Sequence, residues 1–461
     1  MNENQSELNL ICKNRDNSKI IPNIADPCVH CGFCLPTCPS YKILGTEMAS
    51  PRGRMHLAQA IENNEIELDQ TVTSHFDSCL GCFACVTACP SGVRYDQLIE
   101  SIRPKLNSPN SRTPCQNLFR KALLSILPYP KRLRVLLQTI RFYSGSALQS
   151  FIRKRGITNY LGPQISAMES LLPKLKEDFF QDNFPTFNPA FGNKRGRVGL
   201  VLGCVQRCFD PDVNQATLLV LQANGFEVMI PKQQGCCGAV THHQGDLKQT
   251  RILAKELVQS FSSELCEKSE STNNESIEAV IVAAAGCGHT MKAYKELLNK
   301  EDGFNCPVFD VNEFLDIKGL SQSFKEKLRP LTSQNKYREE KENSNIRITY
   351  HDACHMLHGQ GISIEPRRLL REVPNSTLND PSTAGLCCGS AGIYNLVQPQ
   401  EASELGEIKV NDLIHTNPDI IASANIGCTL QLRKHLQGKI KVLHPIEILA
   451  KSAGIHYGPC S

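Results

Sequence analysis

At 461 residues the chain is too long for one ordinary hydrophobic core, so we expect roughly two to four domains. Its 41% hydrophobic and 21% charged residues are typical of a globular protein. A net charge of +4 indicates no particular kind of partner, and we expect no nucleic acid. The 22 cysteines are the unusual feature, and a disulfide scaffold explains them poorly because such scaffolds are short secreted chains.

The N-terminal residues 1–20 are predicted to be a polar tail. They are of mixed charge, unlike a secretory signal or an Arg-rich transit peptide. The best apolar run, Ala279–Ala285, has only seven residues, whereas a membrane span needs roughly 18. We therefore expect a cytoplasmic chain whose thiols stay reduced and bind metals.

Residues 21–105 contain two tight cysteine clusters, CVHCGFCLPTCP and CLGCFACVTACP. In each, three cysteines separated by two residues can hold three corners of an iron–sulfur cube, and a fourth precedes a proline. In chains with two such runs, each fourth cysteine ligates the other cluster. The spacing predicts two crossed [4Fe–4S] clusters, the first on Cys28, Cys31, Cys34 and Cys89 and the second on Cys79, Cys82, Cys85 and Cys38.

Structural zinc is the alternative for these cysteines, but zinc favours separated Cys-x2-Cys pairs that close a tetrahedron. Between the two clusters, Pro51–Glu65 is predicted to be a helix with Ser50 as its N-cap. The aromatic residues Phe33 and Phe83 either exclude water from the clusters or belong to an ordinary core.

Residues 106–190 are predicted to be a basic helical connector. From Ser101 to Met168 there is no Asp or Glu, whereas twelve Lys or Arg occur and apolar residues recur at helical spacing. We expect two amphipathic helices, separated near Pro128 and Pro130. Their apolar sides either pack on the chain's own domains, or they form with the cations a docking surface for anionic lipid or an acidic partner.

The remaining sequence alternates strand, loop and helix, and it repeats itself. GRVGLVLGCVQRC resembles IRITYHDACHM, QGCCGAV matches GLCCGSAG, and AVIVAAAGCGHTM matches DIIASANIGCTLQ. A period of about 140–150 residues is too long for a solenoid. We predict two duplicated α/β domains, 191–320 and 346–461, with a polar insertion over 262–276 and a polar linker over 321–345.

Cysteines follow the predicted strands of both repeats. The carboxyl ends of parallel strands meet at one edge of a sheet, so these thiols should gather there and bind a cofactor. The alternative is a pair of redox-active dithiols. The candidate ligands are Cys204, Cys236, Cys237 and Cys287 in the first repeat and Cys354, Cys387, Cys388 and Cys428 in the second.

The paired repeats resemble the cysteine-rich CCG domain of heterodisulfide reductases. Over residues 24–455, from DPCVHCGFCLPTCPSY and SPRGR through CPSGVRYDQL to LCCGSAGIYNL and ANIGC, the chain is similar to the iron–sulfur subunits of glycolate dehydrogenase, often called glycolate oxidase. The resemblance implies a ferredoxin-type domain with two [4Fe–4S] clusters, followed by two CCG domains that can hold further iron–sulfur clusters. Related subunits serve D-lactate and glycerol-3-phosphate dehydrogenases.

The resemblance also implies how the chain acts. As a subunit of an oxidoreductase complex, it passes electrons from an FAD-binding flavoprotein, which oxidises glycolate to glyoxylate, towards a quinone or similar membrane acceptor rather than oxygen or NAD. No dinucleotide fingerprint, Walker loop or haem motif occurs in the sequence, so a partner must supply the two-electron chemistry. The complex is expected at the inner face of the plasma membrane. A heterodisulfide-reductase-like catalytic subunit is the rival function.

One departure from the CCG pattern concerns its final CxxC. In heterodisulfide reductases five cysteines hold a non-cubane cluster, but here Thr290 and Gln431 occupy the position of the last cysteine. Four cysteines per repeat still suffice for an ordinary cluster. Cys208 is a candidate substitute in the first repeat, and His358 occupies its position in the second.

Six histidines lie close to the CCG motifs in the sequence. A histidine there can protonate a quinone, ligate a metal or simply form local hydrogen bonds. They are His242, His243, His289, His351, His355 and His358.

Overall fold

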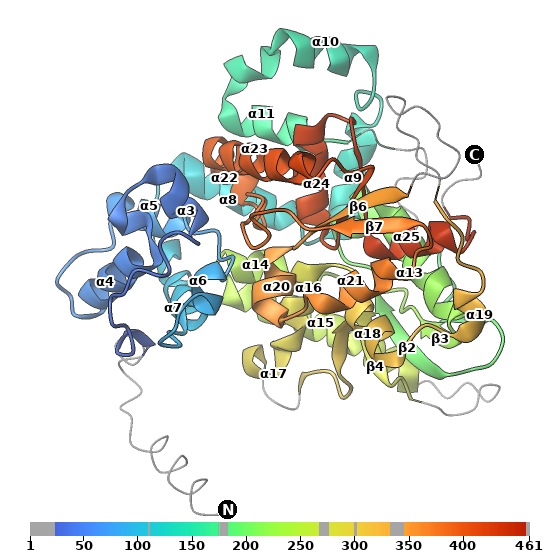
Figure 1. Cartoon of the computed structure of the whole chain (residues 1–461). Coiled ribbons are helices and arrows are strands. Elements are labelled where there is room, and N and C mark those ends of the chain that lie inside the picture. Colours follow the sequence, from blue (N-terminus) through green and yellow to red (C-terminus); the bar gives the residue numbers. More distant parts are fainter. Residues whose placement is uncertain are drawn as a thin grey trace, which may run out of the picture. The chain divides into compact units, whose positions relative to one another are not determined.

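The computed structural model describes residues 24–108, 111–173, 175, 183–266, 276–298, 302–331 and 345–457. The chain forms two compact units, one of Met1–Cys79 with Phe83–Arg112 and one of Leu80–Cys82 with Thr113–Ser461 (Figure 1). The predicted polar tail, most of the insertion and most of the linker lie outside the described residues.

The described part of the first unit is helical. Its core contains Phe76, Leu98 and Ile99 together with several of the cysteines. Ser50 Oγ accepts a hydrogen bond from the Gly53 amide at 3.0 Å, which confirms that the predicted helix begins at Pro51 with Ser50 as its N-cap. The elements are α3 (Pro39–Leu44), η1 (Glu47–Ala49), α4 (Pro51–Glu62), α5 (Gln70–Asp77), α6 (Ala84–Thr87), α7 (Tyr95–Ile102) and η2 (Lys105–Asn107).

The two cysteine loops turn in the same way. In the first loop, His30 and Gly32 have φ values of 55° and 80°, and in the second, Gly81 and Phe83 both have 63°. These residues flank the second cysteine of each cluster at equivalent positions. A left-handed conformation is unfavourable for His and Phe. That His30 and Phe83 both adopt it indicates that the shape of each loop is constrained. The sequence repeat is therefore also a repeat of backbone conformation.

The described part of the connector contains four α-helices, whereas the periodicity predicted two. The break is where it was predicted, because the first helix ends at Ile126 and the second begins at Pro130. The apolar side of the second helix packs through Leu133 and Leu137. The helices are α8 (Pro114–Ile126), α9 (Pro130–Ile140), α10 (Ala147–Arg155) and α11 (Pro163–Leu171), with η3 (Ile157–Leu161) before the last.

Each repeat contains a sheet with the same strand order. The first sheet runs β1-β3-β2-β4-β5, with only β1 antiparallel, and the second runs β7-β6-β8-β9, all parallel. This confirms two duplicated α/β regions. The strands are β1 (Phe187–Asn188), β2 (Gly196–Val201), β3 (Phe226–Met229), β4 (Ala279–Val282), β5 (Val308–Asp310), β6 (Ile346–His351), β7 (Ser376–Asn379), β8 (Ile420–Ser423) and β9 (Lys441–Leu443).

Helices cover both sheets and join the two repeats. A single apolar cluster contains Phe226 and Phe314 of the first repeat and Tyr350 of the second, and each such side chain contributes about 2 kcal/mol when fully buried. Helix α13 (Pro211–Ala223) packs on α25 (Pro445–Ser452), and α18 (Val311–Lys318) on α21 (Ile364–Arg371) (Figure 1). The two repeats therefore form one unit.

The other helices of this unit are short or line the outside of the sheets. They are α12 (Gln206–Phe209), α14 (Ala239–His243), α15 (Leu247–Cys266), α16 (Ala285–Lys292), α17 (Tyr294–Leu297), α19 (Gln322–Lys325), α20 (Cys354–Gln360), α22 (Tyr394–Val397), α23 (Pro399–His415) and α24 (Ile426–Leu436). Among the helices of the described ranges, none combines the length and the apolar character that a bilayer crossing requires.

Candidate metal centres

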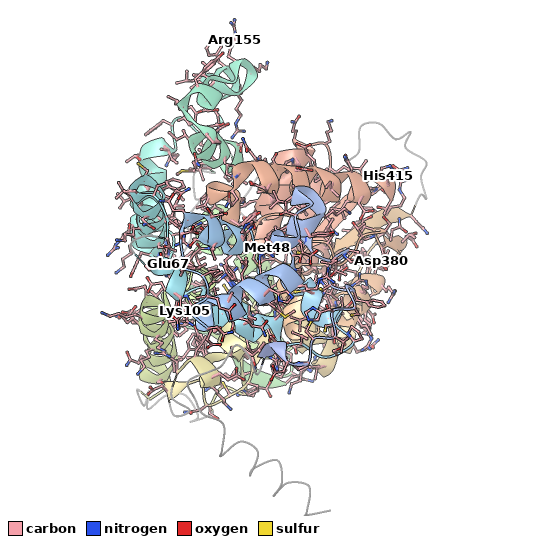
Figure 2. The ribbon with its side chains drawn as sticks, turned by 90° about the vertical axis from the view of Figure 1, so that its left-hand side faces the viewer. Met48, Glu67, Lys105, Arg155, Asp380 and His415 are labelled. Carbon is pink, nitrogen blue, oxygen red and sulfur yellow. The ribbon has the colours of Figure 1, made fainter. Side chains whose placement is uncertain are left out.

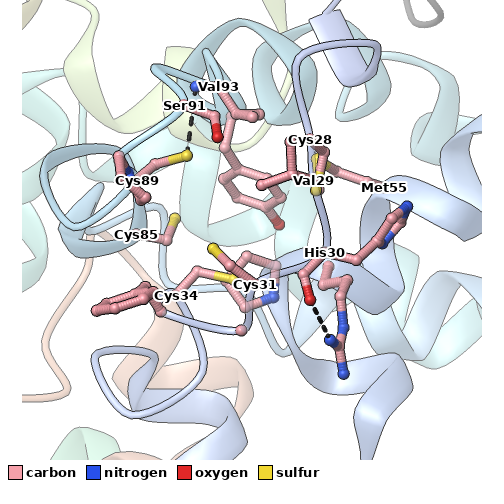
Figure 3. A pocket seen from close by; sticks show the side chains of 16 residues that line it. Cys28, Val29, His30, Cys31, Cys34, Met55, Cys85, Cys89, Ser91 and Val93 are labelled. Atoms are coloured by element: carbon pink, nitrogen blue, oxygen red, sulfur yellow. Dashed lines mark hydrogen bonds between the residues drawn. The ribbon is translucent and has the colours of Figure 1, made fainter.

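In the first unit, one pocket brings together the four cysteines predicted for the first cluster. Cys28, Cys31, Cys34 and Cys89 all line it, and Cys85 also reaches its wall (Figure 3). Apolar side chains make up much of the remaining lining, namely Val29, Phe33, Met55 and Val93, and His30, Arg52, Ser91 and Tyr95 also line the pocket. Cys31 and Phe33 are exposed, so the pocket opens to solvent on that side. Thiols of this number, surrounded by apolar side chains, fit an iron–sulfur cluster.

Arg52 lines this pocket. Its guanidinium donates to the His30 carbonyl at 3.1 Å and forms an ion pair with Glu47 at 2.7 Å. Burial raises the pKa of the Cys34 thiol, the neighbouring Cys28 and Cys38 raise it further, and Arg52 opposes them. A bound iron cluster would supply the positive charge that these thiolates lack.

Arg54 connects the two loops that carry the cysteines of the second predicted cluster. Its guanidinium is only 1% exposed and donates to Ser40 Oγ at 2.8 Å and to Ser78 Oγ at 2.9 Å. Ser40 Oγ lies 3.2 Å from Cys38 Sγ, and Ser78 immediately precedes Cys79. Burial alone lowers the pKa of Arg54, but Tyr95, Cys79 and Cys38 outweigh it, so the pKa is raised.

The SPRGR segment thus places one arginine beside each group of cysteines. In the sequence, this segment predicted a helix start and indicated a family resemblance, but the role of its arginines was missed. Two arginines close to eight cysteines were a visible signal. Cys79 and Cys85 are also buried, and the Tyr95 hydroxyl donates to Cys79 Sγ at 3.6 Å. Cys82 is buried as well and belongs to the short segment Leu80–Cys82 that groups with the second unit.

In the first repeat, the four candidate cysteines gather at the ends of β2, β3 and β4. Cys204 Sγ and Cys236 Sγ are 3.2 Å apart. Hydrogen bonds from Cys236 and from Cys287 lower the pKa of Cys237 well below the usual thiol range. The Tyr294 hydroxyl holds the loop through the Cys237 carbonyl at 2.7 Å. All four of these cysteines are free thiols in the structure, which is also the reduced form of the dithiol alternative.

In the second repeat, the equivalent cysteines also gather at one sheet edge. Hydrogen bonding to Cys387, together with burial, raises the pKa of Cys354 well above the usual thiol range. Cys428 Sγ accepts a hydrogen bond from Asn425 Nδ2 at 3.4 Å. Lys409 is fully buried and donates to the Thr383 carbonyl at 2.6 Å. Burial lowers its pKa, and the charges of Asp412, Cys388, Asp352 and Cys387 oppose that shift. This repeat therefore also places a buried cation near its thiols.

The residues in place of the fifth cysteine are not equivalent. Both polar atoms of the Gln431 amide are hydrogen-bonded: its Oε1 accepts from Asn395 Nδ2 at 3.2 Å, and its Nε2 donates to the Ala402 carbonyl at 2.8 Å. Thr290 is buried, and its hydroxyl has no partner among the described residues. The candidate substitute Cys208 packs with Leu133 and Leu137, in a different apolar cluster from the four ligand candidates.

The six histidines divide into groups. The ring centroid of His355 lies 4.6 Å from that of His243 and 5.0 Å from that of His289, so three of them touch. His358 is hydrogen-bonded to the Gly385 carbonyl at 3.1 Å. His351 instead lies near Cys388 and Cys428, where burial lowers its pKa to about 3 and keeps the imidazole neutral.

Three family profiles match the chain. They are "4Fe-4S dicluster domain" over residues 24–93, "Glycolate oxidase iron-sulfur subunit, linker region" over 116–172, and "Cysteine-rich domain" over 198–292 and 348–433. The first confirms the prediction of two [4Fe–4S] clusters, and the third confirms the duplicated CCG regions.

Similar curated proteins cover nearly the whole chain. The probable glycolate oxidase iron–sulfur subunit of Bacillus subtilis is 32% identical over 440 residues, 93% of this chain and 94% of that protein. The glycolate oxidase iron–sulfur subunit of Escherichia coli is 31% identical over 432 residues, with the same two shares. One component of the fumarate reductase (CoM/CoB) of Methanothermobacter marburgensis is 31% identical over 267 residues, 56% of this chain and 46% of that protein.

Substitution of Arg54 tests the role of its buried charge. Arg54→Met leaves two buried hydroxyls and neighbouring thiolates without their cation, so the free energy of unfolding should fall by about 3 kcal/mol. The iron content should fall as well. Anaerobic urea denaturation and iron analysis measure both, with Arg94→Met, at an exposed ion pair with Asp96, as the matched control. Equal stability and iron content of the two variants would contradict the assigned role.

Proposed function

The chain belongs to the glycolate oxidase iron–sulfur subunit family, and we propose that it is the electron-transfer subunit of a glycolate dehydrogenase. It takes electrons from an FAD-binding flavoprotein partner that oxidises glycolate to glyoxylate. It delivers them to a quinone or another membrane acceptor. The substrate and the flavin belong to the partner, and this chain supplies the path for single electrons.

The observation that carries this proposal is the arrangement of the first unit around its cysteines. The proposed ligands are Cys28, Cys31, Cys34 and Cys89 for one [4Fe–4S] cluster and Cys79, Cys82, Cys85 and Cys38 for the other. The shared pocket of the first four supports the first set. The bridge that Arg54 makes between Ser40, beside Cys38, and Ser78, beside Cys79, supports the crossed second set.

The clusters, when bound, supply one-electron carriers, and the residues of this chain do the rest. Arg52 and Arg54 offset thiolate charge, and charge compensation near a cluster is one determinant of its reduction potential. Phe83 and Tyr95 are buried and exclude water from the second group of cysteines. Phe33 is exposed, so the first group is the one accessible from solvent.

The rival function, a heterodisulfide-reductase-like catalytic subunit, has less support. In those enzymes the last cysteine of the motif is a fifth ligand, and in the second repeat Gln431 occupies that position with its amide already satisfied. The glycolate oxidase relatives also cover 93% of this chain, whereas the fumarate reductase (CoM/CoB) relative covers 56%. A D-lactate or glycerol-3-phosphate dehydrogenase remains the nearer variant, because the partner determines the substrate.

Loss of a cluster ligand tests the relay. Cys34→Ser and Cys85→Ser should each abolish dye-linked or quinone-linked glycolate oxidation by the assembled complex. Glycolate should still reduce the partner's flavin in a single turnover, because that step precedes the clusters. Stopped-flow absorbance and steady-state assays measure the two steps, and Cys115→Ser, at an exposed cysteine outside the clusters, is the control. Unchanged turnover, or lost flavin reduction in an intact complex, would contradict the relay.

We also propose that the connector binds an anionic membrane surface, at the cytoplasmic face of the plasma membrane. Helix α11 packs on α22, α23 and α24, whereas α10 lies outside it and contacts η3 (Figure 1). We call α10 with η3 the outer hairpin. Its apolar side chains are exposed, Tyr160 by 89% and Phe151 by 51%. Figure 2 shows Arg155 at the outer end of α10, pointing away from the ribbon.

Not every cation of the acid-free stretch from Ser101 to Met168 contributes to this surface, so the positive face is smaller than the sequence indicated. Arg103 is buried and donates to the Cys79 carbonyl at 3.1 Å. Arg112 is buried in an ion pair with Asp77 at 2.6 Å. In the outer hairpin, Arg153 is ion-paired with Glu169 at 2.9 Å, whereas Lys154 and Arg155 are exposed beside the apolar residues. Exposed aromatic and leucine side chains next to cations are typical of segments that lie in a membrane interface.

Charge reversal tests this surface. Near anionic lipid each Lys or Arg contributes about 1 kcal/mol, so Lys154→Glu with Arg155→Glu should weaken vesicle binding about thirtyfold or more. The control, Lys248→Glu with Lys439→Glu, makes the same charge change at exposed sites outside the hairpin. Co-sedimentation with phosphatidylglycerol-containing and neutral vesicles measures binding at several salt concentrations. Equal binding of both variants, or binding that does not change with salt or lipid charge, would contradict the membrane role. The cations would then either bind an acidic protein partner or simply be solvated.

A further inference from the structure

The two repeats differ at the end of their central strands. Strand β2 ends at Val201, which pairs with Val282 of β4. Strand β6 ends at the equivalent residue, His351, which pairs with Ser423 of β8. All four side chains are buried. The two repeats can therefore be compared position by position. The first has an apolar pair at this point of the sheet, and the second has a polar pair.

The polar pair has no hydrogen-bond partners among the described residues. Neither ring nitrogen of His351 is hydrogen-bonded, nor is the Ser423 hydroxyl, although His351 is only 1% exposed. Buried polar groups in native proteins are nearly always satisfied, and an exception indicates a bound ion, a water or a functional role. The valines of the first repeat show that this position does not require a polar side chain for folding.

Two of the candidate ligand cysteines of this repeat lie close to His351. A ring nitrogen of His351 and the sulfurs of Cys388 and Cys428 all lie within 4.8 Å of one another, and all three residues are buried. Nitrogen from imidazole and sulfur from cysteine are the donors that iron–sulfur and related centres accept. This trio joins the residue that ends β6 to two cysteines already proposed as ligands.

We propose that His351 is a metal ligand in the second repeat, where it joins Cys388 and Cys428 in holding an iron of an iron–sulfur centre. Gln431, which replaces the last cysteine of the motif, is hydrogen-bonded to Asn395 and Ala402 and does not fill this role. The inference goes beyond the proposed relay, because it depends on neither the partner nor its substrate.

A histidine ligand makes the two repeats electronically different. In the first repeat the proposed ligands are all thiolates, since Val201 stands where the second has His351. The second repeat would then hold its centre with four thiolates and one neutral imidazole, whereas the first has four thiolates alone. An imidazole ligand adds no negative charge, and histidine-ligated clusters have higher reduction potentials than all-cysteine ones.

The test uses the full chain, purified anaerobically after growth with ¹⁵N-histidine. Pulsed EPR of the reduced protein should detect a strongly coupled histidine nitrogen. The other cluster ligands proposed for this chain are cysteines, so the isotope reports on the histidine alone. In His351→Val, which copies the first repeat, this coupling should disappear and the iron content should fall. In His351→Cys the iron should be retained without nitrogen coupling and at a lower potential.

The control is His444→Asn, at another buried histidine, whose ring nitrogen caps α25 by accepting from the Ile446 amide at 3.1 Å. It should keep both the coupling and the iron content. If the coupling is absent from the wild-type protein, persists in His351→Val, or is lost only in the control, the assignment is wrong. Zinc in place of iron in the second repeat would also overturn it. His351→Cys decides the question if His351→Val fails to fold.

Discussion

A thiolate that leaves water needs a positive charge nearby, because an uncompensated buried charge costs several kcal/mol. This chain buries cysteines at its candidate centres, and three of those centres have a cation nearby. In the first unit, Arg52 and Arg54 face the two groups of cysteines. In the second repeat, Lys409 is buried near Cys387 and Cys388. The bound iron supplies the rest of the compensation, so much of the architecture serves to hold metal.

The backbone around Arg54 follows from the same requirement. Helix α4 approaches the preceding turn so closely that a Cβ on Gly53 would lie 2.0 Å from the Glu47 carbonyl oxygen. Only glycine permits this approach, and it brings Arg54 to the two serines beside the cysteines. The CCG repeats use a different solution, in which parallel strands end together and deliver cysteines to one edge. Their duplication allows one copy to keep valines where the other carries His351 and Ser423.

Much of this arrangement could be predicted from the sequence, since spacing along the chain is a local signal. Two runs of CxxCxxCxxxCP predicted the two [4Fe–4S] clusters, and the CCG repeat predicted two similar parallel sheets. The contacts of Arg54 and His351 could not be predicted, because their partners are distant in the chain and the residues themselves match no motif. Helices α10 and α11 were also missed, since their apolar residues are largely exposed and show no clean periodicity. The second cluster motif predicted the pairing of Cys38 with Cys79, but only folding brings Arg54 to both.

Metal analysis of the full chain purified without oxygen tests the central claim most directly. If the cysteine groups are iron–sulfur centres, the protein is brown and contains about eight irons or more per chain, with an equal amount of acid-labile sulfide. Mössbauer spectra of the ⁵⁷Fe-enriched protein should then show the signature of [4Fe–4S] clusters for at least those eight. Stoichiometric zinc with negligible sulfide would contradict the account.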